Sequence, residues 1–216
     1  NDALSKTGQI DFKASREFGQ LPGGPFGVAL GAEFRRESIR LSPTRGTERG
    51  NIIGLGFSAY SGVRDVTAAF AEVVAPVLST LELSSALRVD HYSDVGSTPK
   101  FGLKWTPVRE LALRGTYAEG FRAPSSAENG AGGLAAFTTA TDPVRCALGV
   151  PGTCSAAPVS IITSPNRDLK PEKSKSFTLG VVWDPAPATS LSIDLWQIER
   201  RNELNQEQTD AAIAAG

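Results

Sequence analysis

Two cysteines, Cys146 and Cys154, are the residues whose type and spacing most directly suggest chemistry. Seven residues separate them in a stretch rich in glycine, proline and alanine, with no histidine or third cysteine near enough to complete a zinc site. We predict a local disulfide, which implies an oxidising compartment. Two unrelated free thiols are the alternative. By chain entropy a loop this short contributes at most roughly 2–3 kcal/mol.

Catalysis by side chains finds little support in the sequence. His91 is the single histidine, so a metal site built from several histidines and a His-based triad are both unavailable. Four carboxylates could be brought together by folding, although no spacing marks the paired acids of a glycosidase: Glu33, Glu37, Asp90 and Glu119. We therefore expect no enzymatic activity, no cofactor and no metal site.

The composition is that of a folded chain with no bias toward a charged partner. The formal net charge is −1, and charged residues make up 21% and hydrophobic residues 40% of the 216 residues. We therefore expect neither disorder nor nucleic acid as a partner. No stretch reaches the roughly 18 to 20 apolar residues of a transmembrane helix. That absence does not exclude a membrane, because a transmembrane β-strand needs only about 9 to 11 residues, half of them apolar.

The chain is organised around residues 99–124, which the pattern predicts to be two strands joined by a turn at Pro107. Apolar and polar side chains alternate with a period of two, which places one face of each strand in an apolar medium and the other in a polar one. The apolar positions are Phe101, Leu103, Trp105, Leu111, Leu113 and Tyr117.

The same alternation recurs along the chain and predicts eight strands. The segment 63–77 is apolar on both faces, so a buried helix is the alternative there. Pro76 and the alternation that follows favour a strand, whose facing the sequence does not set. Residues 205–216 are expected to be loop or a short helix. The predicted strands are 10–18, 26–39, 63–77, 80–92, 99–106, 111–118, 176–184 and 191–196.

Short turns alternate with longer connections, and we predict that residues 125–169 lack regular structure. A loop of that length is uncommon unless it has a function. Short turns on one side and long loops on the other are typical of outer-membrane barrels. The predicted turns are 20–25, 77–80, 107–110 and 184–189, and the longer loops are 41–61, 92–98 and 123–171. Four aromatic residues near strand ends fit an interfacial girdle: Phe26, Trp105, Phe121 and Trp183.

Two architectures fit this alternation. In a soluble antiparallel β-sandwich the apolar faces would form a core, and the function would be carbohydrate or protein binding. In a membrane barrel the same faces would contact lipid. The opposite faces carry many small residues beside charges, and the strands reach ten or more residues, which favours the barrel. A small diffusion porin is a third interpretation, against which the long 125–169 segment counts.

Three segments resemble the β-barrel region of TonB-dependent outer-membrane receptors. Residues 87–96, LRVDHYSDVG, resemble the family's strand ending in R-x-D-x-Y-S-D-x-G. Residues 99–105, PKFGLKW, resemble its P-K-x-G-x-x-W partner, and residues 115–124, GTYAEGFRAP, resemble the strand closing in G-F-R-A-P. Weaker matches are GAEFR at 31–35 and NRDLKPEKS at 166–174, which is similar to N-x-x-L-K-P-E-x-S.

This resemblance covers most of residues 26–200 and implies a fold class: an all-β, antiparallel transmembrane β-barrel segment of about eight strands with short periplasmic turns and long extracellular loops. Residues 1–216 would be an internal part of the barrel domain. The implied role is active uptake of a ferric siderophore, haem, cobalamin or a glycan across the outer membrane of a Gram-negative bacterium. The implied partners are outer-membrane lipid, a small-molecule or metal-chelate ligand, and TonB only through a plug and a box that these residues do not contain.

The polar strand faces supply the first group of expected site residues. Arg88, Asp90, Lys104 and Arg114 share these faces on neighbouring strands. We hypothesise that they line the lumen and pair across strands, because an Arg or Lys facing lipid costs about 2 to 4 kcal/mol at the midplane. Structural ion pairs against a plug are the alternative to ligand contact, and the favoured one.

The resemblance places a second group, Glu119, Phe121 and Arg122, at the rim of a ligand vestibule, although Phe121 could instead anchor the aromatic girdle. We expect the 125–169 segment, stapled by Cys146–Cys154, to capture ligand, because loops on a rigid scaffold commonly carry binding. A shielding surface loop is the alternative for that segment.

Overall fold

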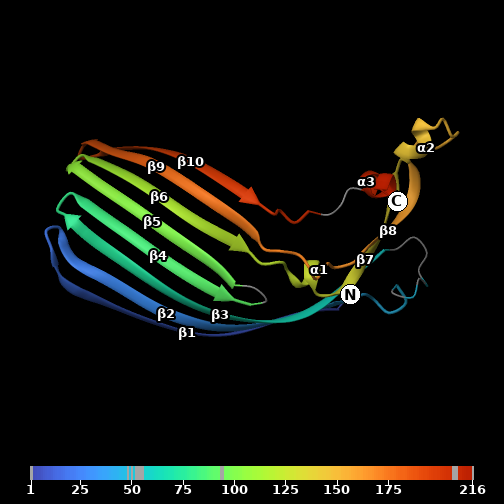
Figure 1. Cartoon of the computed structure of the whole chain (residues 1–216), viewed down its shortest axis with the longest axis horizontal. Helices are drawn as coiled ribbons and strands as arrows, with labels where there is room; N and C mark the ends of the chain where they lie inside the picture. The colour runs from blue at the N-terminus through green and yellow to red at the C-terminus, as the bar shows by residue number, and fades with distance from the viewer. Residues whose placement is uncertain are drawn as a thin grey trace.

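The computed structural model describes residues 2–47, 49, 51, 56–92, 95–205 and 209–215, so Ser93 and Asp94 of the first motif lie outside it. Ten strands form one antiparallel sheet, and eight of them follow the path β1-β2-β3-β4-β5-β6-β9-β10 (Figure 1). The strands are β1 (Asp2–Leu21), β2 (Gly24–Ser42), β3 (Phe57–Leu78), β4 (Leu81–His91), β5 (Val95–Val108), β6 (Leu111–Arg122), β7 (Ala131–Ala140), β8 (Ala157–Thr163), β9 (Glu172–Ala186) and β10 (Thr189–Arg201).

Three short helices accompany the sheet: α1 (Ser126–Asn129), α2 (Pro143–Ala147) and α3 (Thr209–Ala215). The last of them lies in the tail that the sequence predicted as loop or short helix. Among the described residues, no helix is both long and apolar enough to cross a membrane.

The eight predicted strands are confirmed, including the 63–77 segment, which lies within β3. The predicted short turns are confirmed as well: the connections β1–β2, β3–β4, β5–β6 and β9–β10 each leave two residues between strands. All four lie at the same end of the sheet, on the left of Figure 1. Seven of the eight strands are longer than predicted, whereas β4 is slightly shorter. β1, β2 and β3 contain 20, 19 and 22 residues.

Two predictions about connections are wrong. Residues 125–169 are not irregular, because they contain β7 and β8. β4 ends at His91, so the first residues of β3 present a free edge, and Phe57–Ser61 pair there with 131–135 of β7. This ladder orders a Gly- and Ala-rich segment whose own strand propensity is weak. Residues 92–98 are not a long loop either, since the β4–β5 ladder continues to the pair His91–Val95.

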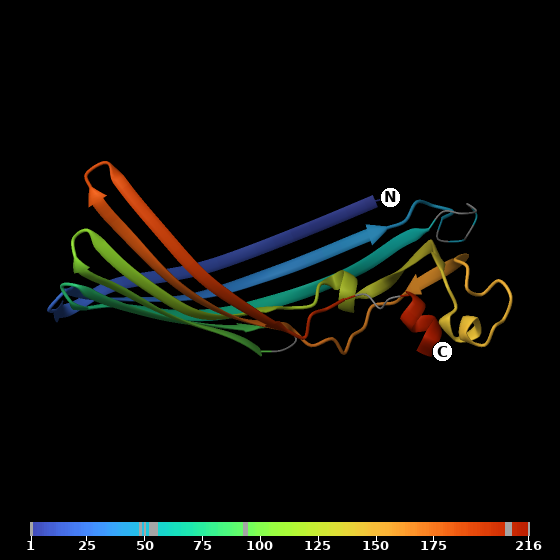
Figure 2. The same ribbon diagram turned by 90° about the horizontal axis from the view of Figure 1, so that it is seen from above.

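The sheet is a single curved layer, as Figure 2 shows. A sandwich would bring the apolar residues of its strands together in a dry core, among them Leu30, Leu83, Leu103 and Val181. Their exposed fractions are 56%, 40%, 44% and 41%. These side chains therefore form no core within the described part of the chain, and the sandwich interpretation is wrong.

One face of the sheet, here called the outer face, carries a continuous apolar band. On β1 and β2 it runs from the pair Phe18–Phe26 to the pair Ile10–Phe34, with Arg16 the one charged residue of the band on these two strands. The next outward residue of β2 is Arg36. At about 3.3 Å per residue and a tilt of about 40°, the band is roughly 20 Å high. That is close to the about 25 Å apolar band of outer-membrane barrels.

The opposite face, here called the inner face, is polar and more enclosed. The three buried residues of β3 and β4, Val66, Ala68 and Asp90, all belong to it. Register also sets the facing of β3, because Phe70 lies opposite Gly31 and therefore points inward. A Cβ at Gly31 would overlap the Phe70 ring, which also lies 5.9 Å from Nζ of Lys13. Phe70 thus fills the space above a strand that has no side chain there.

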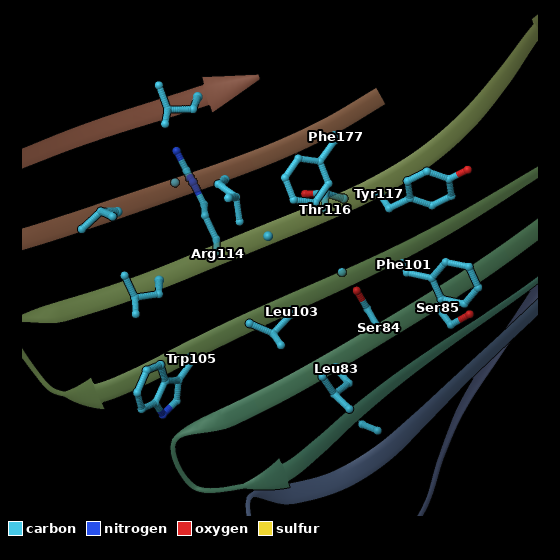
Figure 3. Close-up of a pocket in the computed structure, with 18 of the residues that line it drawn as sticks. Leu83, Ser84, Ser85, Phe101, Leu103, Trp105, Arg114, Thr116, Tyr117 and Phe177 are labelled. Atoms are coloured by element: carbon cyan, nitrogen blue, oxygen red, sulfur yellow. The ribbon is translucent and has the colours of Figure 1, made fainter. Parts of the chain in front are cut away.

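Three of the four aromatic residues expected in an interfacial girdle lie at the end with the short turns. Trp105 pairs with Leu81 and Trp183 with Leu111, close to those turns, and Phe26 lies beside the first one. Phe121 lies at the other end of its strand. Figure 3 shows Leu83, Leu103 and Trp105 on the outer face, where a shallow hollow of about 890 Å³ has mainly apolar lining residues beside Ser84, Ser85, Arg114 and Thr116.

Candidate functional site

An ionic network joins three neighbouring strands on the inner face. Glu33 of β2 accepts hydrogen bonds from Arg35 at 2.7 Å and from Arg88 of β4 at 2.9 Å. Arg88 also donates to Asp90, with a shortest distance of 2.8 Å. Arg35 also donates a hydrogen bond to Glu37 at 2.7 Å, and Glu37 accepts a further hydrogen bond from Arg64 of β3. The network holds three arginines and three carboxylates, so its charges balance.

One of these contacts, between Arg88 and Glu33, crosses a whole strand, and a small residue on that strand leaves room for it. Arg88, which lies opposite Phe70 in the ladder, reaches Glu33 diagonally across β3, where the inward residue opposite Glu33 is Ala68. A small residue also leaves room on β9, where Arg114 of β6 donates a hydrogen bond to Asp194 of β10 at 2.7 Å across Gly180. A Cβ at Gly180 would come 2.7 Å from Nε of Arg114.

All four residues of the first predicted group therefore lie on the inner face. Arg88 and Asp90 pair with each other on one strand, and two of the residues pair across strands, Arg88 with Glu33 and Arg114 with Asp194. Lys104 lies between Glu82 and Arg114 in the ladder and forms no ion pair within the described residues. The sequence analysis overlooked Arg64 and Asp194. The alternation of side chains along β2 and β4 indicated the other residues of the network, because the charged residues of each strand share one face.

Arg122 forms a clamp at the end of β6, above the apolar band. Its guanidinium donates to Glu172, the first residue of β9, at 2.8 Å and to Glu128 of α1 at 3.0 Å. Glu172 also accepts a bond from the backbone N–H of Leu204, which follows β10, at 2.7 Å. A fifth residue, Arg64, donates to the carbonyl of Pro124 at 3.3 Å. These bonds fix both ends of the 125–169 segment to the sheet.

Glu119 and Phe121 lie at the same level as Arg122 but do not join its clamp. Glu119 shares the outward alternation with Tyr117, whose hydroxyl donates to it, and with Lys175, whose Nζ lies 3.8 Å away. The Phe121 ring stacks on Tyr92 with centroids 5.6 Å apart. The structure thus brings the three predicted rim residues to one strand end without converging them on one point.

The 125–169 segment is a hairpin extension of the sheet that ends in a disulfide-stapled tip. β8 pairs with β7, which pairs with β3. The predicted disulfide is confirmed: Cys146, near the end of α2, is bonded to Cys154, and the bond closes the turn that follows the helix. Asp142 caps α2 by accepting a bond from the Arg145 N–H at 2.9 Å. The segment expected to capture ligand therefore has a defined shape.

A cavity of about 1030 Å³ lies beside this hairpin, within the upper range of small-molecule sites. β8, α1, α3 and residues 203–205 line it, with apolar contributions from Ile161, Leu169 and Ile213. Glu128 belongs both to its wall and to the Arg122 clamp, and its carbonyl accepts a bond from Asn166 at 2.8 Å. The described residues contain no cluster of His, Cys, Asp and Glu that could hold a metal ion.

The clamp has a pH dependence that can be measured. Hydrogen bonds from Arg122 lower the pKa of Glu172 from 4.5 to about 2 and lower the pKa of Glu128. Depressed carboxylate pKa values mean that the clamp is fully formed above about pH 4.5 and is lost as the pH falls toward 2. Spin labels at Ala127 and Lys173 should give one narrow distance distribution from pH 5 to 7 and a broad one near pH 2. Unchanged distributions at pH 2 would contradict the assignment, and Arg122→Gln should give the broad distribution at every pH.

Comparison with known proteins identifies the family of this sheet. The family described as TonB dependent receptor-like, beta-barrel, matches residues 2–215. The chain belongs to this family. Curated proteins contain no match to the sequence. The end of this TonB-dependent receptor segment that carries the two-residue turns is accordingly its periplasmic end.

Solved siderophore receptors share the fold at low sequence identity. The siderophore receptor PirA from Acinetobacter baumannii matches with a TM-score of 0.70 and 16% identity, over 93% of this chain and 28% of that one. A variant of the ferric enterobactin receptor PfeA from Pseudomonas aeruginosa, in complex with enterobactin, matches with 0.69 and 18%, over 92% and 27%. PirA from Pseudomonas aeruginosa matches with 0.61 and 14%, over 92% and 33%. The chain thus spans about a third or less of each of these receptors.

Proposed function

We propose that this chain forms part of the wall and one ligand-capture segment of a receptor that imports a ferric siderophore across the outer membrane. The observation that carries the proposal is the clamped hairpin beside its cavity, at the end of the sheet opposite the two-residue turns. The names of PirA and PfeA as siderophore receptors support this choice among the ligands that the family resemblance implies.

In this proposal the charged residues have different roles. Arg88, Asp90 and Arg114 act as structural ion pairs of the lumen wall, because neighbours on the same face already neutralise them. Arg122 is a positioning residue that holds the capture segment over the vestibule, with Glu119 and Phe121 at its rim. Energy coupling through TonB requires a plug outside these residues.

Uptake of radiolabelled iron tests the proposal in cells that express the complete receptor. We expect a ferric siderophore to be imported and Arg122→Gln to raise the KM about tenfold. That factor corresponds to about 1.4 kcal/mol of binding free energy, which is spent on ordering the segment when the clamp no longer holds it in place. Arg16→Gln, an outer-face change at the opposite end, should leave the KM unchanged. Import of haem, cobalamin or a glycan in place of every ferric siderophore tried would refute the proposal.

A further inference from the structure

A group of basic residues lies on the outer face of β1 and β2, just beyond the apolar band. Lys6 lies directly opposite Ser38. Arg36 and Arg40 are the residues two positions either side of Ser38, so both are diagonal neighbours of Lys6, about 7–8 Å away between Cα atoms. All three side chains are exposed. We call Lys6, Arg36 and Arg40 the β1–β2 basic cluster.

The positive charge of this cluster is only partly compensated. Within the described residues, Lys6 and Arg40 form no ion pair, and Arg36 has one contact of 3.5 Å with Asp65. Side-chain exposures of 63% for Arg36 and 49% for Asp65 make that contact weak, because exposed ion pairs contribute little. Asp2 is the second nearby outward carboxylate, so three cations face two acids.

The surface between the cations is open. Gly8 lies directly opposite Arg36, and a Cβ added to Gly8 would meet nothing within 4 Å. The other outward residues around the three cations are Ser38, Ser61, Leu4 and Val63. The last two are themselves 51% and 61% exposed, so they do not cover the cations. A group larger than water can therefore approach all three cations from the membrane side.

The corresponding level on β9 and β10 differs. Lys175 lies 3.8 Å from Glu119, and Arg201 lies 2.6 Å from Glu199. Two of the three outward cations there already have carboxylate partners on the protein, and Lys173 is the third. The β1–β2 basic cluster is thus the outer-face group at this level with the least internal neutralisation.

We propose that the β1–β2 basic cluster binds the phosphate groups of an anionic lipid headgroup in the outer leaflet. Ile10 and Phe34 end the apolar band directly below the cluster, so acyl chains that cover these residues place their headgroup at the three cations. Lys and Arg next to the apolar band attract anionic lipid headgroups, while the acyl chains of the same lipid cover the apolar band.

Native mass spectrometry of the complete receptor in detergent, titrated with a bisphosphorylated acylated disaccharide lipid, tests the proposal. Each cation near an anionic surface contributes about fivefold in affinity, so Arg36→Gln/Arg40→Gln should weaken binding about 25-fold and Lys6→Gln about fivefold. Asp65→Asn should strengthen binding. The dephosphorylated lipid should bind the wild type about as weakly as the bisphosphorylated lipid binds the double variant.

Arg16→Gln provides the matched control, because it removes one outward cation at the opposite end of the apolar band. It should leave lipid affinity unchanged. Inorganic phosphate should not compete at millimolar concentration, because it has no acyl chains to anchor it. If the double variant does not fold, the single Lys6→Gln variant carries the test. Equal affinity of wild type and variant for the bisphosphorylated lipid, or competition by free phosphate, would overturn the proposal.

Discussion

Replacing Leu103 with arginine should destabilise the barrel by about 2–4 kcal/mol, because the new charge would lie on the lipid-facing band near its middle. Leu103 is 44% exposed and pairs with Leu83 on β4 and Gly115 on β6. Neither neighbour offers a carboxylate that could pair with the charge. Denaturant unfolding of the complete receptor in lipid vesicles measures the loss.

The control for this prediction is the next residue along the strand. Lys104 faces inward and forms no ion pair in the described part of the chain, so Lys104→Gln should change the free energy of unfolding by less than about 0.5 kcal/mol. Cysteines introduced at the two positions give a second readout. A water-soluble thiol reagent should label position 104 and leave 103 protected by lipid. Better labelling at 103 would show that the facing is reversed.

Replacing Glu33 with alanine should cost about 2 kcal/mol of stability. Glu33 is the most enclosed glutamate of the inner-face network, with 11% of its side chain exposed, and it accepts bonds from both Arg35 and Arg88. Removing it leaves each of these arginines with one carboxylate instead of two. Hydrogen bonds to charged groups contribute about 1.5–3 kcal/mol, and losing one partner of an enclosed pair is costly.

Asp11 supplies the comparison, because it lies directly opposite Glu33 on β1 and has no ion pair within the described residues. Asp11→Ala should leave the free energy of unfolding within about 0.5 kcal/mol of the wild type, or raise it by relieving repulsion between two opposed carboxylates. Losses of equal size for the Asp11 and Glu33 variants would rule out a specific network. In a double-mutant cycle, Glu33→Ala and Arg88→Ala should be coupled by about 1 kcal/mol.

Several features of the site were accessible from local sequence patterns. Charged residues at 33, 35 and 37 share the parity of Gly31, so their inward facing follows from the alternation alone. The disulfide also followed from local information, because the two cysteines of the chain lie eight positions apart in a turn-rich segment. Arg122 was identified through the family motif at 115–124, although its carboxylate partners Glu128 and Glu172 were not.

The amino-acid sequence by itself determined which face of most strands is apolar and where the two-residue turns fall. Both depend on neighbours along the chain, because side chains alternate across a strand with a period of two. Tertiary structure alone decided which side chains of β3 face inward, the pairing of β7 with the free edge of β3, and the partners of Arg88 and Arg114. These depend on register between distant segments: Phe70 lies opposite Gly31, and Ala68 and Gly180 leave room for ion pairs to cross the strand between them.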